Sequence, residues 1–343
     1  MKNLFLSRLL PTSVLRRPLF QSSIRHYAVQ TPGVFNSSTK HLQRERAASD
    51  IEGSRKVDYL RDEVAVRLCE RLLDINRHFP DVLDLGANAC NIARALTIPS
   101  TTLETPIVPS TRLTNLTSAD PSSTLLHRDV DLPFNGLLPS HTRSVLPPVD
   151  HPLPFEPASF SAVISSLSLH WINDLPSLLA QINRILKPDS PFIAAMLGGD
   201  SLFELRTTLQ LSELDRLGGV STRTSPLADV RDVGGLLTKA GFKLLTVDVD
   251  DIIVDYPDIF ALMKDLQAMG ESNAVVMRQM GAISRDVLLA GEGVYRELHG
   301  NENGSLPATY RVIYMIGWTE GDGQQQPLRR GSGEVNLKDI LED

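Results

Sequence analysis

Residues 160–197 constrain the fold of this chain more than any other stretch, because they read as a strand, a helix and a second strand. Phe160–Ser165 and Phe192–Leu197 are short apolar runs, which suit strands buried on both faces of a sheet. Between them, apolar residues recur at helical spacing over Leu175–Leu186, and Pro188 ends the helix. Such a unit belongs in a parallel sheet with right-handed crossovers, so the sequence predicts an α/β fold.

The loops that follow these two strands are the first candidates for a functional site. In open parallel sheets, ligands bind at the carboxyl ends of the strands. Ser165–Trp171 and Gly198–Arg206 would therefore lie at the mouth of such a site. An imidazole at His170 could serve as a base or a ligand. Alternatively, His170 and Trp171 could form a partly buried wall of the pocket.

A second signal is the sequence Val-Leu-Asp-Leu-Gly-Ala-Asn-Ala-Cys at residues 82–90, where a short strand ends in a turn. A turn that lets the backbone approach a cofactor closely needs positive φ at some positions. The stretch resembles the first motif of S-adenosylmethionine-dependent methyltransferases, an acid followed by three alternate glycines. Asp84 and Gly86 match it, whereas Asn88 and Cys90 replace glycines. Asn tolerates the left-handed region, but Cys90 adds a side chain at the most crowded point and puts cofactor affinity in question.

The same resemblance implies the other cofactor-binding residues. In such folds an acid at the end of the second strand holds both ribose hydroxyls. The candidates are Asp84, Gly86, Ala87 and Asn88 in the first motif, Asp120 for the ribose, Asp150 near the adenine ring, and Ser165 after the fourth strand. Asp120 and Asp150 could instead be turn-capping residues, because Asp is common in turns. Residues 97–149 give weak signals, and a loop this long is unusual in a compact domain, so short strands are expected there.

The first thirty residues differ in composition from the rest of the chain. They contain five basic and no acidic residues, with many Leu, Phe and Ser residues, and the first acid is Glu45. This composition is typical of a mitochondrial transit peptide, expected to end at residue 27 after Arg-His-Tyr. A disordered basic arm is the alternative. No apolar run approaches the length of a membrane span.

Charge and cysteine content narrow the partners and the compartment. The chain has 34 basic and 41 acidic residues, a net charge of −7, and loss of the basic leader would leave it more acidic. This balance argues against non-specific nucleic-acid binding. Cys69 and Cys90 make no disulfide framework and fit a reducing compartment such as the matrix.

The remaining pattern predicts a methyltransferase-like domain over residues 55–319. Residues 28–54 are polar and are expected to form a linker or a loosely docked arm, and residues 320–343 a flexible tail. Insertions at 200–228 and 257–300 are expected to form a helical lid. Further predicted elements are helices at 55–78, 91–96, 201–217, 229–240 and 257–269, and strands at 81–86, 112–120, 243–248, 250–256 and 306–318.

Longer blocks make the family resemblance more specific. Residues 165–175 resemble the fourth-strand region of methyltransferases related to the malonyl-carrier-protein enzyme of biotin synthesis. Residues 198–206, 266–273 and 307–318 extend the match to one branch of that group, the family of assembly factor five of mitochondrial respiratory complex I. The match covers about residues 40–335 and is weakest over 97–149.

The resemblance implies a Rossmann-like class I S-adenosylmethionine-dependent methyltransferase fold with a helical lid insertion. It also implies a matrix protein that acts early in complex I assembly. Family members are linked to hydroxylation of an arginine on a core subunit of the peripheral arm. The partners implied are that core subunit and other assembly factors, with a peripheral contact to the inner membrane. Hydroxylation usually calls for iron held by two histidines and a carboxylate. His151, His170, Asp150 and Asp174 are the only cluster near the predicted site, and because their spacing is poor no metal site is predicted.

The catalytic candidates are His170, Trp171, Asp200 and Glu204. Asp200 and Glu204 follow two glycines and could hold a positively charged arginine, since carboxylates accept its forked donors well. A serine three residues before Glu204 also matches a capping box. Glu271–Asn273 would lie on a lid over the site, or form a helix-ending turn.

Three functions remain open. The first is complex I assembly through arginine modification, using S-adenosylmethionine. The second is an ordinary methyltransferase acting on a small acid or a carrier protein. The third is a cofactor-free assembly scaffold, which the two replaced glycines favour.

Overall fold

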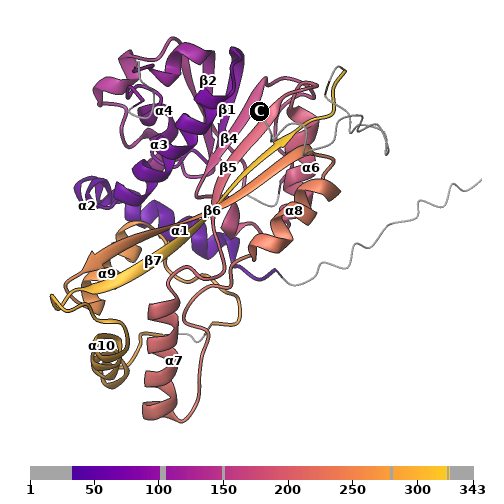
Figure 1. Cartoon of the computed structure of the whole chain (residues 1–343). Coiled ribbons are helices and arrows are strands. Elements are labelled where there is room, and N and C mark those ends of the chain that lie inside the picture. Colours follow the sequence, from indigo (N-terminus) through magenta and orange to yellow (C-terminus); the bar gives the residue numbers. More distant parts are fainter. Residues whose placement is uncertain (1–32, 101–105, 149–150, 279–280, 323, 325–343) are drawn as a thin grey trace, which may run out of the picture. The chain divides into compact units, whose positions relative to one another are not determined.

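A mostly parallel sheet of seven strands lies at the centre of the described part of the chain (Figure 1). The strand order is β3-β2-β1-β4-β5-β7-β6, and only β7 runs antiparallel to its neighbours. The strands are β1 (Phe79–Leu85), β2 (Leu113–Asp120), β3 (His141–Val145), β4 (Ala162–Ser166), β5 (Pro191–Leu197), β6 (Lys243–Tyr256) and β7 (Leu306–Trp318). The predicted α/β architecture and the predicted second strand at 112–120 are confirmed.

This computed structural model describes residues 33–100, 106–148, 151–278, 281–322 and 324. The expected transit peptide, most of the expected tail and Asp150 lie outside these residues. No helix within the described ranges is both long and apolar enough to cross a membrane.

Helices cover both faces of the sheet. The helices are α1 (Ser37–Ser49), α2 (Ile51–Lys56), α3 (Tyr59–Asp74), α4 (Asn91–Ala95), α5 (Ser123–His127), α6 (Leu175–Ile185), α7 (Phe203–Leu217), α8 (Val230–Lys239), α9 (Ile259–Ala268) and α10 (Arg285–His299). α3 and α4 pack on one face and α6 and α8 on the other. The alternation along β5 shows why both faces need cover: Phe192 belongs to the core under α6 and α8, and Ile193 to the core under α3.

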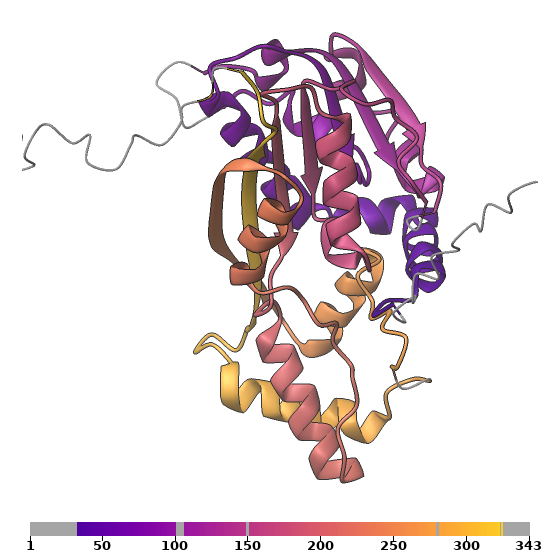
Figure 2. The same ribbon diagram turned by 90° about the vertical axis from the view of Figure 1, so that its right-hand side faces the viewer.

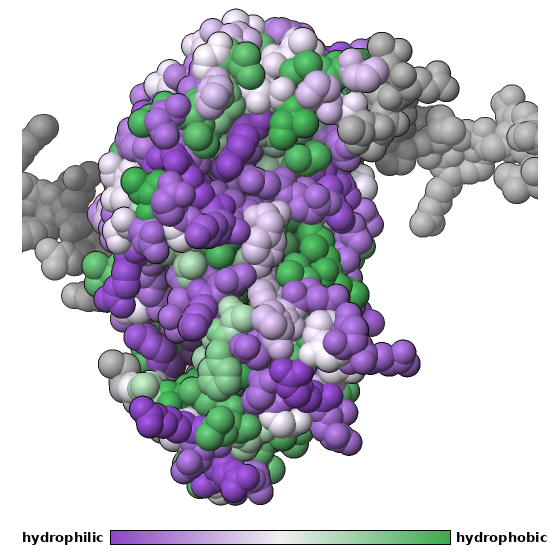
Figure 3. All heavy atoms as spheres, turned by 90° about the vertical axis from the view of Figure 1, so that its left-hand side faces the viewer, coloured by the Kyte–Doolittle hydropathy of each residue, from purple (hydrophilic) through white to green (hydrophobic). Residues whose placement is uncertain are grey.

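α7, α9 and α10 lie beyond the carboxyl ends of the parallel strands, where α7 packs across α10 (Figure 2). Both helices of this pair also present large apolar side chains to solvent, among them Leu214 and Leu289. Figure 3 shows apolar residues on the surface of the lower part of the molecule, where Figure 2 shows these helices. These helices therefore extend the fold over the strand ends at which ligands are expected.

The N-terminal segment differs from the prediction. Residues 28–54 were expected to form a linker or a loosely docked arm, but residues 37–49 form α1 and residue 51 begins α2. Asn36 caps α1 by accepting a hydrogen bond from Thr39 N at 2.8 Å, and Asp50 caps α2 through Gly53 N at 3.0 Å. α1 contacts α5 and α9, which lie far apart in the sequence. It is therefore packed against the domain and is not a linker.

The strand prediction for residues 243–256 was wrong in one respect. Two strands were expected, and a single long strand, β6, is present, with a bulge between Lys243 and Thr246. The acids at the expected break, Asp250 and Asp251, lie partly exposed on opposite faces of the strand and pair with Arg67 and Arg311. The sheet edge therefore accommodates charges that resemble a loop in the sequence.

Candidate functional site

The turn after β1 keeps the backbone of a glycine-rich motif although two of its three glycines are replaced. Gly86, Asn88 and Cys90 have φ values of 73°, 52° and 60°, so all three are left-handed. The backbone N–H groups of Gly86 and Ala87 donate to Ala119 O at 2.8 and 3.1 Å, which ties the turn to the end of β2. The backbone conformation of the motif is therefore retained with both substitutions, and Asn88 and Cys90 are strained because they are not glycines.

The side chain of Asn88 fills space above this turn. Its amide nitrogen donates to Gly86 O and Ser166 O, both at 3.1 Å. Its amide oxygen accepts from Arg44 Nη2 of α1 at 2.9 Å. The residue that replaces a motif glycine thus connects the turn both to β4 and to the N-terminal helix.

Asp120 stands at the end of β2, as expected, and is fully buried. It accepts hydrogen bonds from Asn88 N at 3.0 Å and Ser122 N at 2.7 Å. Arg44 Nη2 makes an ion pair with the oxygen that also accepts from Asn88 N, 2.8 Å from Oδ2. The carboxylate predicted to hold a ribose therefore binds an arginine of its own chain.

Arg44 and Asn88 border a cavity of about 100 Å³ at the ends of β1 and β4. Of the residues predicted to bind cofactor, Gly86 and Asn88 line this cavity. The others within the described ranges, Asp84, Ala87, Asp120 and Ser165, are buried and do not line it. Apolar residues form much of the remaining wall, including Leu85, Leu146, Pro147, Leu153 and Leu169.

Asp84 lies inside the sheet beneath the turn and has no exposed surface. One carboxylate oxygen is 3.4 Å from Ser118 Oγ, and the other has no hydrogen-bond partner among the described residues. Burial, followed by the nearby charge of Asp120, raises the pKa of Asp84 to about 8. Ser165 donates its hydroxyl to Leu85 O at 2.7 Å, so both residues shape the turn from below.

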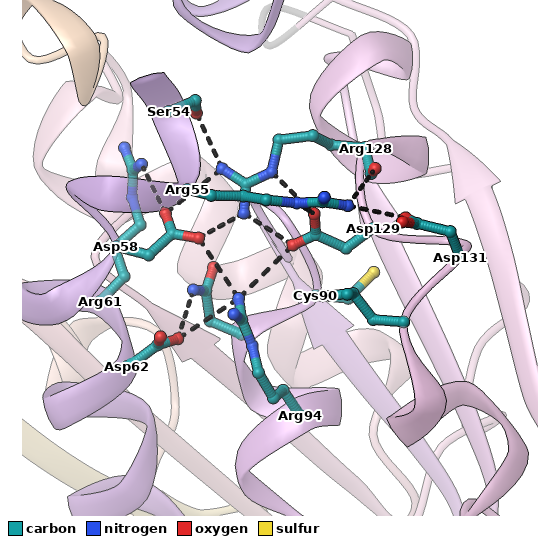
Figure 4. A network of polar contacts seen from close by, with 12 residues as sticks. Ser54, Arg55, Asp58, Arg61, Asp62, Cys90, Arg94, Arg128, Asp129 and Asp131 are labelled. Carbon is teal, nitrogen blue, oxygen red and sulfur yellow. Dashed lines mark hydrogen bonds and ion pairs between the residues drawn. The ribbon is translucent and has the colours of Figure 1, made fainter. Parts of the chain in front are cut away.

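A buried ion network holds the other side of the turn (Figure 4). Arg128 pairs with Asp58 and, at 2.6 Å, with Asp129. Arg94, which follows the turn in α4, lies 3.3 Å from Asp58 and 3.5 Å from Asp129. Cys90 sits beside this network, and burial raises the pKa of its thiol to about 11. The thiol therefore stays protonated and acts as a small packing residue.

A second cavity, of about 440 Å³, lies beside the first. Its walls are largely apolar and come from α3, α7, α9 and β7, with Leu60, Leu202, Leu205, Leu209, Met263, Leu266 and Tyr310 among them. His170, Trp171 and Glu271 line one end. Trp171 and Glu271 line the smaller cavity as well, so they stand where the two spaces meet.

Glu271 is the single carboxylate that lines the larger cavity within the described ranges. It accepts from Trp171 Nε1 at 2.6 Å and from Arg61 Nη2 at 3.2 Å, and lies 3.5 Å from His170 Nε2. Burial alone would raise the pKa of Glu271, but Lys40, His170 and Arg61 hold it well below its usual range. His170 Nδ1 is buried and has no partner among the described residues. The end of the cavity thus carries an ionised carboxylate, beside an imidazole whose second nitrogen is buried without a partner among the described residues.

Lys40 approaches the same junction from α1. Its Nζ donates to Gly270 O at 3.0 Å and Ser272 O at 2.8 Å, and lies 3.2 Å from the ring centroid of Trp171. Burial lowers the pKa of Lys40 to about 7. Lys40 and Arg44 are four residues apart on one helical face and both line the smaller cavity, and Lys40 also holds the turn that carries Glu271.

The two acids proposed on α7 lie elsewhere. Asp200 is exposed and pairs with Arg311 of β7. Glu204 is buried and accepts from both the N–H and the hydroxyl of Thr309. Neither lines the larger cavity. The expected capping box is also absent, because Ser201 donates to Arg311 O at 2.9 Å while Leu202 is the N-cap of α7.

The predicted lack of a metal site remains a prediction. Within the described ranges, no group of three His, Cys, Asp or Glu side chains is placed to hold a metal ion. His151 lines the smaller cavity, whereas Asp174 caps α6 by accepting from Ser177 N at 3.0 Å. His170 lies at the larger cavity, and Asp150 is outside the described residues.

Strand order, the left-handed turn after β1 and the acid after β2 together define the class: this is a Rossmann-like class I S-adenosylmethionine-dependent methyltransferase fold. A family model described as a methyltransferase domain matches residues 104–194. The solved structure of the YcgJ protein from Bacillus subtilis covers 74% of this chain and 97% of its own, with 13% identity and a TM-score of 0.49.

Two curated relatives define the particular family. Mitochondrial arginine-hydroxylase NDUFAF5 of Homo sapiens is 44% identical over 313 residues, which are 91% of this chain and 84% of that protein. Malonyl-[acyl-carrier protein] O-methyltransferase of Halorhodospira halophila is 31% identical over 307 residues, 89% of this chain and 96% of that protein. The chain belongs to the NDUFAF5 arginine-hydroxylase family, a branch related to the malonyl-carrier-protein methyltransferases.

The residues around the smaller cavity fit S-adenosylmethionine in kind. The turn has the required left-handed backbone, Asp120 ends β2, and apolar residues line the wall. The volume of about 100 Å³ is nevertheless below the roughly 300 Å³ of a small ligand pocket. Because Arg44 pairs with Asp120, a ribose could reach that carboxylate only if this ion pair opened.

Proposed function

We propose that this protein hydroxylates an arginine of a core complex I subunit during assembly of the peripheral arm in the mitochondrial matrix. Family membership supports the reaction, since the relatives are named arginine-hydroxylases. The observation that carries the proposal in this chain is the placement of Glu271. It is an ionised carboxylate at the end of an apolar cavity that adjoins the cofactor cavity.

An arginine side chain suits this larger cavity. Its aliphatic stem matches walls of Leu and Met residues, and its guanidinium needs a carboxylate at the far end. Glu271 already pairs with Arg61, but Lys40, with a pKa of about 7, is largely neutral above that pH. Arg61, Trp171 and His170 take three of the about four lone-pair sites of the Glu271 carboxylate, so one site is left for an incoming guanidinium. His170 and Trp171 would then flank the bound group.

We further propose that S-adenosylmethionine occupies the smaller cavity. When bound, it supplies an activated methylsulfonium group. Asp120 would hold the ribose after releasing Arg44, while the backbone from Gly86 to Asn88 and the apolar wall would orient the rest. Asp84 and Ser165 would support the turn from beneath.

The experiment that separates the three functions is mass spectrometry of complex I subunits in cells that lack this protein. Re-expression of the full chain should restore assembly and add one oxygen to one arginine. A gain of a methyl group instead would establish the methyltransferase function, which the relationship to the malonyl-carrier-protein enzymes favours. Restored assembly without any modified residue would establish the scaffold function.

A matched pair of variants locates the site. Glu271→Gln should abolish the modification, because it removes the negative charge that faces the cavity. Asp200→Asn should leave it unchanged, since that exposed acid pairs with Arg311 outside the cavity. The reverse result would place the arginine on α7, as the sequence suggested.

A further inference from the structure

Three tyrosine hydroxyls form a continuous line from the larger cavity to the surface. Tyr310 of β7 lines the cavity and is only 1% exposed. Its hydroxyl lies 3.1 Å from that of Tyr256, at the end of β6. The Tyr256 hydroxyl contacts that of Tyr59, at the start of α3, and Tyr59 donates to Asp265 Oδ2 of α9 at 3.1 Å. Four separate elements thus place one chain of polar atoms inside an apolar wall.

The terminal carboxylate gives this chain a direction. An ionised carboxylate only accepts hydrogen bonds, so Tyr59 donates to Asp265 and its oxygen receives the hydrogen of Tyr256. Tyr256 in turn receives the hydrogen of Tyr310. Each hydroxyl passes its hydrogen outward, which leaves a lone pair of the Tyr310 oxygen free to accept a proton.

The hydroxyls also keep the protons that such a chain needs. Burial raises the pKa of Tyr59, Tyr256 and Tyr310, so all three stay protonated at neutral pH. Tyr59 is 36% exposed, which brings the outer end of the line into contact with water.

We propose that Tyr310, Tyr256 and Tyr59 form a proton relay between the larger cavity and Asp265. A group in the cavity gives a proton to the Tyr310 oxygen, and the Tyr310 hydrogen moves to Tyr256. Tyr256 passes its hydrogen to Tyr59, and Tyr59 passes its own to the Asp265 carboxylate. One proton leaves the cavity, Asp265 releases it to water, no electron moves, and rotation of the hydroxyls resets the line.

The relay rests on the proposed function only in that a reaction in this cavity must exchange protons with solvent. Glu271 is a poor proton acceptor, because neighbouring cations hold its pKa well below the usual range. The line of tyrosines would carry a proton out of the cavity without protonating Glu271.

Two other buried tyrosines are internal references. Tyr295 has no exposed surface, and its hydroxyl donates to Pro307 O at 2.7 Å. Tyr314 is 1% exposed, and its hydroxyl has no partner among the described residues. Neither hydroxyl joins the line, so these residues show how fast a buried tyrosine hydroxyl exchanges without a relay.

The test is the exchange rate of each tyrosine hydroxyl, read by NMR in mixed H₂O and D₂O on the full chain labelled at tyrosine Cζ. We expect the Tyr310 hydroxyl to exchange at least about tenfold faster than that of Tyr295. Tyr256→Phe should lower the exchange rate of the Tyr310 hydroxyl to that of the Tyr295 hydroxyl. Tyr295→Phe, which removes a buried hydroxyl outside the line, should leave Tyr310 unchanged.

Two results would overturn the relay. One is a wild-type Tyr310 rate no faster than that of Tyr295. The other is a Tyr310 rate unaffected by Tyr256→Phe, because protons would then reach solvent through the cavity. Tyr59→Phe, at the partly exposed end, provides the same break if Tyr256→Phe fails to fold. The readout needs no enzyme activity, so failure of the relay is distinct from failure of the proposed hydroxylation.

Discussion

Removal of the Arg44 side chain should tighten S-adenosylmethionine binding. Arg44 Nη2 lies 2.8 Å from Asp120 Oδ2 and 2.9 Å from Asn88 Oδ1, and its side chain is 13% exposed. A hydrogen bond to a charged group contributes about 1.5–3 kcal/mol. A ligand that needs Asp120 must first open this contact, and its apparent affinity falls by the fraction of molecules that are open. At about 1.4 kcal/mol per factor of ten, Arg44→Ala should raise the affinity roughly tenfold to a hundredfold.

Calorimetric titration of the full chain with S-adenosylmethionine measures this change directly. The matched control is Arg46→Ala, which removes an exposed arginine from the same helix and should bind as the wild type does. The same Arg44 substitution should lower the free energy of unfolding by about 1.5–3 kcal/mol, because it leaves the buried Asp120 charge with only two backbone donors. Unchanged or weaker binding by Arg44→Ala would refute the view that Arg44 competes with the cofactor.

Three further predictions concern stability. Glu271→Gln should lower the unfolding free energy by about 1.5–3 kcal/mol, since it removes the carboxylate nearest to buried Arg61 and leaves that arginine with Met269 O and the more distant Asp58; a denaturation midpoint equal to the wild type would contradict this. Asp84→Asn should flatten the pH dependence of stability. Because the native pKa of Asp84 is about 8 and its unfolded pKa about 4, the native state holds the extra proton, and wild-type stability should fall by up to about 1.4 kcal/mol per unit as pH rises between those values. Parallel curves of stability against pH for the two proteins would rule that out. Cys90→Gly should be about 1 kcal/mol more stable in urea than Cys90→Ala, because at φ 60° glycine alone is unstrained, and the opposite order would disprove left-handed strain there.

The fold could be predicted because its central strands carry signals that depend on local pattern alone. The run from Phe192 to Leu197 is buried at every position, so its apolar character has one explanation, a strand covered on both faces. At the sheet edge, a strand cannot be recognised by an apolar run in this way. β6 is largely exposed, and partly buried acids such as Asp250 are tolerated because they pair with arginines from other elements. Pairing between distant segments leaves no trace in local hydrophobicity.

The site was only partly predictable for the same reason. Asn88 and Asp120 stand where the motif places them, but Arg44 and Lys40 were missed because α1 is polar along its whole length. These two cations are buried by partners that the fold supplies, a carboxylate for one and backbone carbonyls for the other. Their spacing of four residues was the available signal, since it places both on one face of a helix. The line of tyrosines had no such signal, because its members come from separate elements.

α1 lines the smaller cavity and also contacts the turn that carries Glu271, which stands where the two cavities meet. Arg44 holds Asp120 at the smaller cavity, and Lys40 holds the turn that carries Glu271 at the junction with the larger one. The two side chains are about one helical turn, roughly 6 Å, apart along a rigid element, so a shift that frees Arg44 also displaces Lys40. We therefore expect a ligand that takes Asp120 to alter the charges around Glu271, and by linkage a ligand that takes Glu271 to alter the affinity at Asp120 by the same factor. The segment that resembled a linker in the sequence is, in the fold, the helix that contacts both Asp120 and the turn carrying Glu271.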